Sequence, residues 1–134
     1  MNAVELLMSV DRGKIEALPE KTIELKRLSE MVGEPYNVTM RAIPARRAVE
    51  ILSTGADRDG GVDYGKAFDA NLLTVAAGLV EPDLKDRSLQ KHFGAATPKD
   101  LAEKVFTGGE IAQMATIIMQ LSGYGTETET EIKN

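Results

Sequence analysis

The chain contains no cysteine and no tryptophan, and only one of its 134 residues is a histidine. The absence of cysteine excludes disulfides, zinc–thiolate sites, iron–sulfur clusters and thiol catalysis. Aromatic residues make up 4% of the chain, so leucine, isoleucine, valine, methionine and alanine must build the core. That composition favours helices over a β-sandwich. No run of about 18 apolar residues occurs, and we therefore expect no membrane-spanning helix.

Basic charge is also in short supply, because the formal net charge is −5. An acidic chain lacks the electrostatic footprint of a protein that binds phosphate backbones, so we expect no nucleic-acid partner. The N-terminus carries Glu5 where a signal peptide needs a positive flank. We interpret the protein as cytoplasmic, with a length that suits a single domain.

Two runs of alternating apolar and polar residues occur early in the chain, at 22–28 and 36–43. They flank a Gly-Glu-Pro connection at 33–35, which predicts a β-hairpin over residues 22–43. A lone hairpin is marginal in water. It must therefore pack on the helices or join the strands of another chain.

Helical patterns follow, and several of their ends carry capping residues. The first helix follows Pro44, with Ala48, Val49 and Leu52 on one side. The later boundaries are marked by Asp63, Gly94, Thr97 with Pro98, and Thr107 to Glu110. We expect an α+β fold, mostly α, in which an N-terminal β-hairpin precedes a compact bundle of about five short helices over residues 45–122.

The last predicted helix, over residues 108–122, is far more apolar than a surface helix. Its apolar arc spans roughly 220°, where a surface helix needs roughly 100°. We assign its central stripe to the core: Ile111, Met114, Ile118 and Leu121. Ile117 and Met119 widen that stripe on both sides, and Ala112 extends it. The helix is either centrally buried or covered by a partner, and these three residues are candidate interface positions.

Residues of the types used in catalysis or metal binding are isolated from one another. His92 lies beside a predicted helix C-terminus, where an imidazole suits the helix dipole. Asp57, Asp59 and Asp63 lie in one loop, but other residues occupy the glycine and glutamate positions of an EF-hand. We expect no catalytic, cofactor-binding or metal site, and we interpret the protein as a non-enzyme.

Two further features of the sequence are candidates for ligand binding. Gly108 and Gly109 open a helix and in principle suit an anion, but Glu110 follows at once and would repel it. Arg46 and Arg47, together with Arg41, form a basic cluster. A helix-face salt-bridge network or an acidic protein partner explains the cluster better than nucleic acid does. Arg46 and Arg47 are therefore candidate interface residues too.

Short motifs from residue 81 onwards occur in an order and spacing that are more specific than each motif alone. They are Glu81-Pro82-Asp83-Leu84, Phe93-Gly94, Thr97-Pro98, Gly109-Glu110-Ile111 and Leu121-Ser122-Gly123-Tyr124. With Ile23–Leu28 and Tyr36–Ile43 they make the chain similar to the XkdN-like tail assembly chaperones of long-tailed bacteriophages. The resemblance covers residues 20–125, which we expect to form one domain. Residues 1–19 are expected to be a variable extension and 126–134 a disordered polar tail.

The resemblance implies a binding function rather than a reaction. Such chaperones bind the tape measure protein, keep it soluble and help tail tube subunits assemble around it. It implies a homo-oligomer without cofactor in the host bacterial cytoplasm, absent from the mature virion. The alternative is a structural virion component of the tail or head–tail connector, which purified virions would contain.

Overall fold

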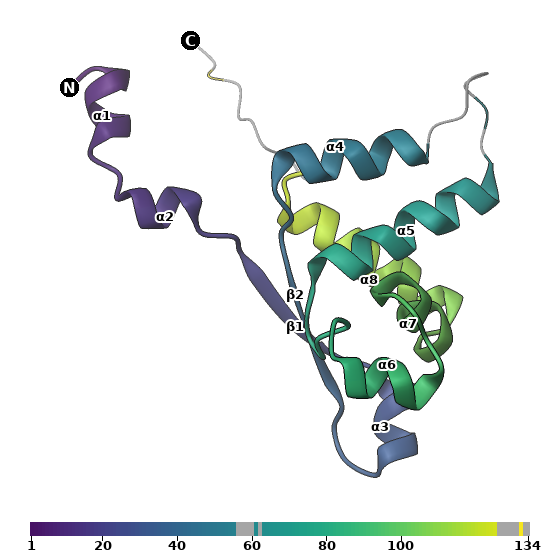
Figure 1. Ribbon diagram of the computed structural model, residues 1–134. Helices are drawn as coiled ribbons and strands as arrows, with labels where there is room; N and C mark the ends of the chain where they lie inside the picture. Colours follow the sequence, from purple (N-terminus) through teal and green to yellow (C-terminus); the bar gives the residue numbers. More distant parts are fainter. Residues whose placement is uncertain (56–60, 62, 126–131, 133–134) are drawn as a thin grey trace.

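A computed structural model of the protein describes residues 1–55, 61, 63–125 and 132 (Figure 1). The described elements, in chain order, are α1 (Ala3–Met8), α2 (Arg12–Glu16), β1 (Glu20–Glu24), α3 (Lys26–Val32), β2 (Asn37–Arg41), α4 (Ala45–Thr54), α5 (Tyr64–Gly78), β3 (Leu79–Glu81), α6 (Arg87–Phe93), α7 (Pro98–Val105) and α8 (Gly108–Leu121). None of the helices in these residues is long and apolar enough to cross a membrane.

The sheet is antiparallel and has the order β1-β2-β3 in the described part of the chain. Glu20 of β1 lies opposite Arg41 of β2, and Glu24 lies opposite Asn37. The central strand β2 buries Val38 and Met40 completely. Helix α8 contacts this strand and α5, so the core lies between the sheet and the helices.

The expected fold class is wrong in its N-terminal part. The first two strands do pair as predicted, but a helix, α3, connects them in place of a Gly-Pro turn. The cause is an ambiguous pattern, because Leu25 and Leu28 are three residues apart and also fit one helix face. Leu25 is buried and Leu28 packs partly against the core, so tertiary contacts favour the helix.

The sheet also has a third strand that the predicted hairpin lacked. The chain leaves α5 at Gly78 and enters β3 at Leu79. A Cβ atom at Gly78 would lie 2.6 Å from the Ile118 side chain and 3.0 Å from the Arg41 carbonyl oxygen. Glycine therefore lets α5 approach α8 and β2 closely, and β3 then pairs with β2.

The helix ends follow the predicted caps. Asp63, Thr97 and Thr107 each accept a hydrogen bond from the backbone N–H three residues later. Gly94 adopts a left-handed conformation, with φ of 68°, at the end of α6. Helix α4 turns a different face to the core than the sequence predicted. It buries Ala48 and Ile51 and leaves Val49 and Leu52 exposed.

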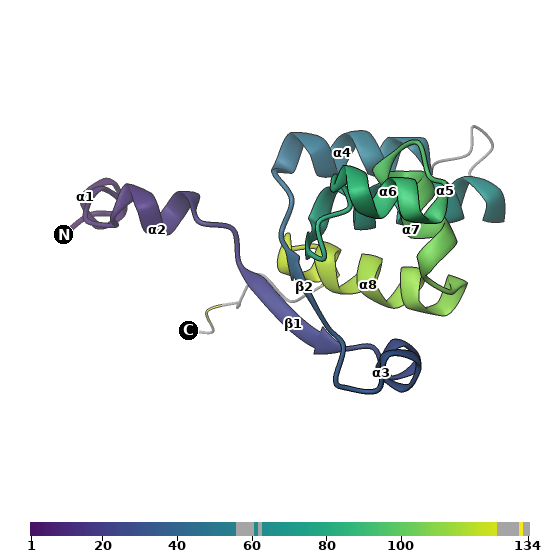
Figure 2. The same ribbon diagram turned by 60° about the horizontal axis from the view of Figure 1, so that its bottom comes forward.

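Residues 1–18 form an arm that stands apart from the body (Figures 1 and 2). Neither α1 nor α2 contains a buried residue. Val4, Leu7 and Met8 lie in the short helix α1. All buried residues of the described chain lie between Leu25 and Ile118, so the arm contributes nothing to the core.

Candidate partner-binding surfaces

Helix α8 is a central core helix along most of its apolar stripe. Ile111, Met114 and Ile118 are buried, whereas Leu121 is only partly buried. Its exposed residues include Ala112, Gln113, Thr116 and Gln120. The apolar composition is therefore explained largely by packing against α5 and β2.

The flanking residues of α8 are half-buried and lie on opposite sides of the stripe. Ile117 and Met119 both pack partly against the core. At about 100° per residue they are separated by roughly 160° around the helix axis. Ala112 is on the Met119 side, so Met119 and Ala112 share a surface that Ile117 does not.

A shallow hollow of about 390 Å³ lies beside Met119. Its lining residues are Asn71, Ala115, Thr116, Met119, Gln120, Tyr124 and Gly125. Met119 offers a flexible apolar side chain at this point, and Tyr124 is 37% exposed. The hollow therefore combines the apolar side chain of Met119 with the polar side chains of Asn71, Thr116 and Gln120.

The predicted basic cluster divides between different surfaces. Arg47 makes an ion pair of 3.2 Å with Glu50 on α4, which agrees with the salt-bridge interpretation. Arg46 lines a hollow on the outer side of the same helix. Arg41 is exposed on β2 and lines a hollow beside Leu79. This hollow adjoins one beside Arg47, because both are lined by Ala76, Ala77 and Lys85.

Arg47 also borders a groove of about 440 Å³ that the sequence did not reveal. Apolar residues of α5, Leu73, Ala76 and Ala77, form part of it, and Lys85 and Lys99 add positive charge. Lys99 is also 3.3 Å from Asp69. The cations come from three separate segments, so no local pattern could have brought them together. The groove suits an apolar segment that carries acidic residues.

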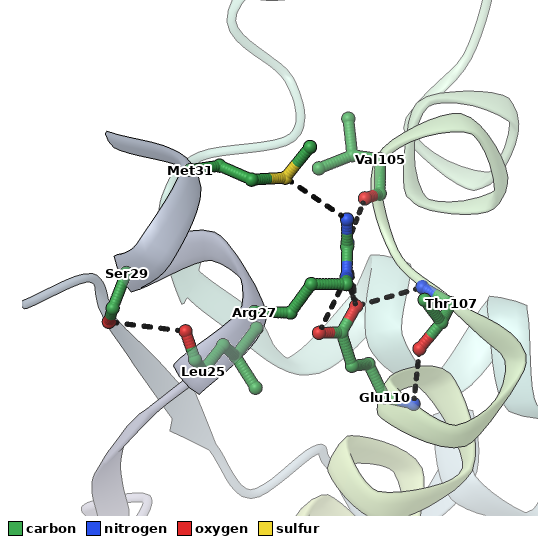
Figure 3. Close-up of polar contacts among 7 residues, drawn as sticks. All are labelled: Leu25, Arg27, Ser29, Met31, Val105, Thr107 and Glu110. Atoms are coloured by element: carbon green, nitrogen blue, oxygen red, sulfur yellow. Dashed lines mark hydrogen bonds and ion pairs between the residues drawn. The ribbon is translucent and has the colours of Figure 1, made fainter. Parts of the chain in front are cut away.

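One ion pair connects the N-terminal half of the chain to α8 (Figure 3). Arg27 of α3 donates from Nη2 to Glu110 Oε1 at 2.8 Å and to the Val105 carbonyl oxygen at 2.8 Å. Glu110 also accepts from the Thr107 N–H at 2.8 Å, which completes a capping box. No local sequence pattern indicates this contact, since Arg27 and Glu110 are 83 residues apart.

The environment of Glu110 changes its proton affinity. Burial by itself raises its pKa, but hydrogen bonds from Arg27 and Thr107 outweigh burial, and the net pKa is lowered. Glu110 therefore stays charged and holds the start of α8. Its carboxylate also lies at the helix N-terminus, the place where we considered an external anion at Gly108 and Gly109.

The remaining candidates for chemistry stay apart. His92 lies in the last turn of α6. The ring centroids of His92 and Phe93 are 4.8 Å apart, and the rings are arranged edge to face. Asp63 caps α5, whereas Asp57 and Asp59 lie outside the described residues. Within the described ranges, no three His, Cys, Asp or Glu residues are placed to hold a metal ion.

Comparison with known families gives a match over nearly the whole chain. Residues 4–134 match the family described as phage XkdN-like tail assembly chaperone protein. The matched range is longer than residues 20–125, on which the resemblance was based, and includes most of the arm. No curated protein matches the chain.

A solved structure shares the fold. The crystal structure of the protein yqbn is similar to this chain with a TM-score of 0.55 and 18% sequence identity. The similarity covers 86% of this chain and 97% of the other. At this identity the match concerns the fold alone.

Proposed function

Because this chain belongs to the phage XkdN-like tail assembly chaperone family, we propose that it binds the tape measure protein during tail assembly. In this proposal it keeps that long, apolar, helix-prone chain soluble and helps tail tube subunits assemble around it. The role is one of binding, without catalysis or cofactor. The observation that carries the proposal is the family match over residues 4–134.

We propose the Met119 hollow as the place where an apolar helix of the client docks. Met119 lines this hollow together with the partly exposed Tyr124, and Ala112 lies on the same side of α8 two turns earlier. Flexible methionine side chains adapt to different apolar partners, and an amphipathic client helix would bury its apolar face there. The basic groove beside Arg47 would take acidic residues of the same client.

Ile117 and Arg46 are interface candidates on other surfaces. Ile117 lies on the opposite flank of α8, and Arg46 lies on the outer side of α4. One short client helix cannot cover these positions together with Met119. We therefore assign them to contacts with a second subunit or with tail tube protein. The complex would form in the host bacterial cytoplasm and would be absent from the mature virion.

Co-expression with the tape measure protein tests the proposal. The wild-type chain should increase the soluble fraction of the tape measure protein and co-purify with it. Met119→Glu should reduce co-purification at least about tenfold, since a charge would enter the apolar hollow. Gln113→Glu is the matched control, because it adds the same charge at an exposed position of α8.

Two results would contradict the proposal in different ways. If the wild-type chain neither solubilises nor retains the tape measure protein, the proposed client is wrong. If Met119→Glu and Gln113→Glu retain the client equally, the client is right but the docking surface is elsewhere. Circular dichroism of each variant shows that a loss of binding is not a loss of folding.

A further inference from the structure

The arm of residues 1–18 has no partner within the described chain that explains its structure. Eight of its large apolar side chains are between 36% and 80% exposed: Met1, Val4, Leu6, Leu7, Met8, Val10, Ile15 and Leu18. Helices α1 and α2 have six and five residues. Isolated helices shorter than about 12 residues are marginal in water. The arm therefore needs an apolar surface to stabilise it.

Helix α4 carries an apolar stripe that faces solvent. Ala45, Val49 and Leu52 are spaced at i, i+4 and i+7, and Val49 and Leu52 are 56% and 46% exposed. A hollow of about 380 Å³ lies beside Ala45 and Val49. The stripe has the length and apolar character that one face of α1, formed by Val4, Leu7 and Met8, requires.

The charges beside the two stripes are complementary. Glu5 is the sole charged residue of α1, and Arg46 borders the stripe of α4. Within the described residues neither side chain forms an ion pair. When the apolar faces meet, the carboxylate of Glu5 can reach the guanidinium of Arg46.

The direction of the arm helps to distinguish between docking on α4 of the same chain and docking on α4 of a second copy. The arm begins beside its own α4, because Pro19 accepts a hydrogen bond of 2.9 Å from the Ala42 N–H and α4 begins at Ala45. However, the arm and α4 leave this end of the sheet in opposite directions (Figures 1 and 2). The arm thus points away from the α4 helix of its own chain.

We propose that two copies of this chain exchange their arms, with α1 of each copy seated on the α4 stripe of the other. Donor and acceptor lie at the same end of the sheet, so one two-fold axis satisfies both contacts and closes the dimer. The arm spans at most about 40 Å, well beyond the length of α4 of about 15 Å. Burying both arms removes on the order of 1,000–2,000 Å² from water, which is the range of stable dimers.

This dimer is a specific form of the contact with a second subunit in the proposed function. The inference therefore rests on that part of the proposed function. Its test measures mass in solution without any client, so it can fail while client binding holds. The wild-type chain of 14.5 kDa should sediment at twice that mass at micromolar concentration. Leu7→Glu in the arm and Val49→Glu in the acceptor should each sediment as monomers.

A mixture of the two variants gives the sharpest result. Leu7→Glu retains an intact acceptor and Val49→Glu retains an intact arm, so one of the two exchanged contacts can form in a mixed dimer. The equimolar mixture should therefore regain dimers that neither variant forms alone. Val32→Glu is the control, because Val32 on α3 is 55% exposed, like Val49, and lies near the opposite end of the sheet. This variant should remain dimeric.

A charge reversal provides an independent test if a glutamate substitution in the arm or in α4 disturbs the fold. Glu5→Arg and Arg46→Glu should each weaken the dimer several-fold, and the double variant should recover it. The proposal is overturned if the wild-type chain is monomeric, as it would be if each arm docked on its own α4. It is also overturned if Val49→Glu dimerises like wild type, or if Leu7→Glu loses the client yet remains a dimer.

Discussion

Glu110 acts at the junction of α7 and α8 through a single carboxylate. It accepts hydrogen bonds from Thr107 and Arg27, and its side chain is 13% exposed. The partner Arg27 is 38% exposed, so solvent screens the ion pair and limits its contribution to stability. The contact fixes α3 against the start of α8.

Replacement of Glu110 by glutamine tests this role. The carbonyl oxygen of the new amide can still accept from the Thr107 N–H, so Glu110→Gln removes the charge and keeps the capping geometry. We expect the free energy of unfolding to fall by about 1 kcal/mol at pH 7. Urea unfolding of both proteins measures the difference.

The pH dependence of that difference follows from the lowered pKa of Glu110. The charged form stabilises the fold above the unfolded carboxyl pKa of about 4.3, and the contribution is lost as pH falls through the folded value. Wild type and Glu110→Gln should converge in stability in acid. A difference that stays constant from pH 7 down to pH 3 would contradict the assignment.

Gly78 is a second residue whose neighbours determine its identity. A methyl group there would overlap the fully buried Ile118 side chain and approach the Arg41 carbonyl oxygen. Gly78→Ala should destabilise the protein by about 2 kcal/mol in thermal or urea unfolding. Gly109→Ala, where no atom lies within 4 Å of the added Cβ, should be neutral or slightly stabilising. Equal effects would refute the close approach.

At the scale of elements, local chemistry predicted the helix ends well. Asp63, Thr97 and Thr107 are caps that act within four residues of chain, so the sequence alone contains the whole contact. The expected β-hairpin failed for the opposite reason. Whether Leu25 and Leu28 lie on a strand or a helix depends on packing against distant residues.

The Thr97 cap offers an element-scale prediction. Its Oγ1 accepts from the Asp100 N–H at 3.1 Å at the start of α7. Thr97→Ala should lower the free energy of unfolding by about 1 kcal/mol. Thr116→Ala removes the same hydroxyl from an exposed position within α8 and should change stability by less than about 0.5 kcal/mol. Thermal unfolding of the pair distinguishes them, and a larger loss at Thr116 would invalidate the comparison.

Candidate surfaces were harder to predict than helix ends. The apolar excess of α8 is mostly buried, with Met119 half-buried beside a hollow and Ala112 exposed. The groove beside Arg47 draws its charge from Lys85 and Lys99 on other segments. The spacing of apolar residues shows which face of a helix is apolar. It does not show whether another element of the fold covers that face.

For the whole molecule, the division of the chain into an extension, one domain and a tail stays a prediction. The buried residues of the described chain lie between Leu25 and Ile118. The predicted polar tail, apart from Ile132, and the acidic loop between Gly55 and Asp63 fall largely outside the described residues. Residues 1–19, which we expected to be only a variable extension, form the largest exposed apolar segment of the described chain.

We propose that this molecule assists assembly and then leaves, in contrast to a structural component of the tail or connector. Quantitative mass spectrometry of phage-producing cells and of purified virions distinguishes these two roles. We expect the chain to co-precipitate with the tape measure protein from cell lysate. We also expect purified virions to contain the chain only in traces. Stoichiometric copies in virions, without a complex with the tape measure protein in cells, would contradict it.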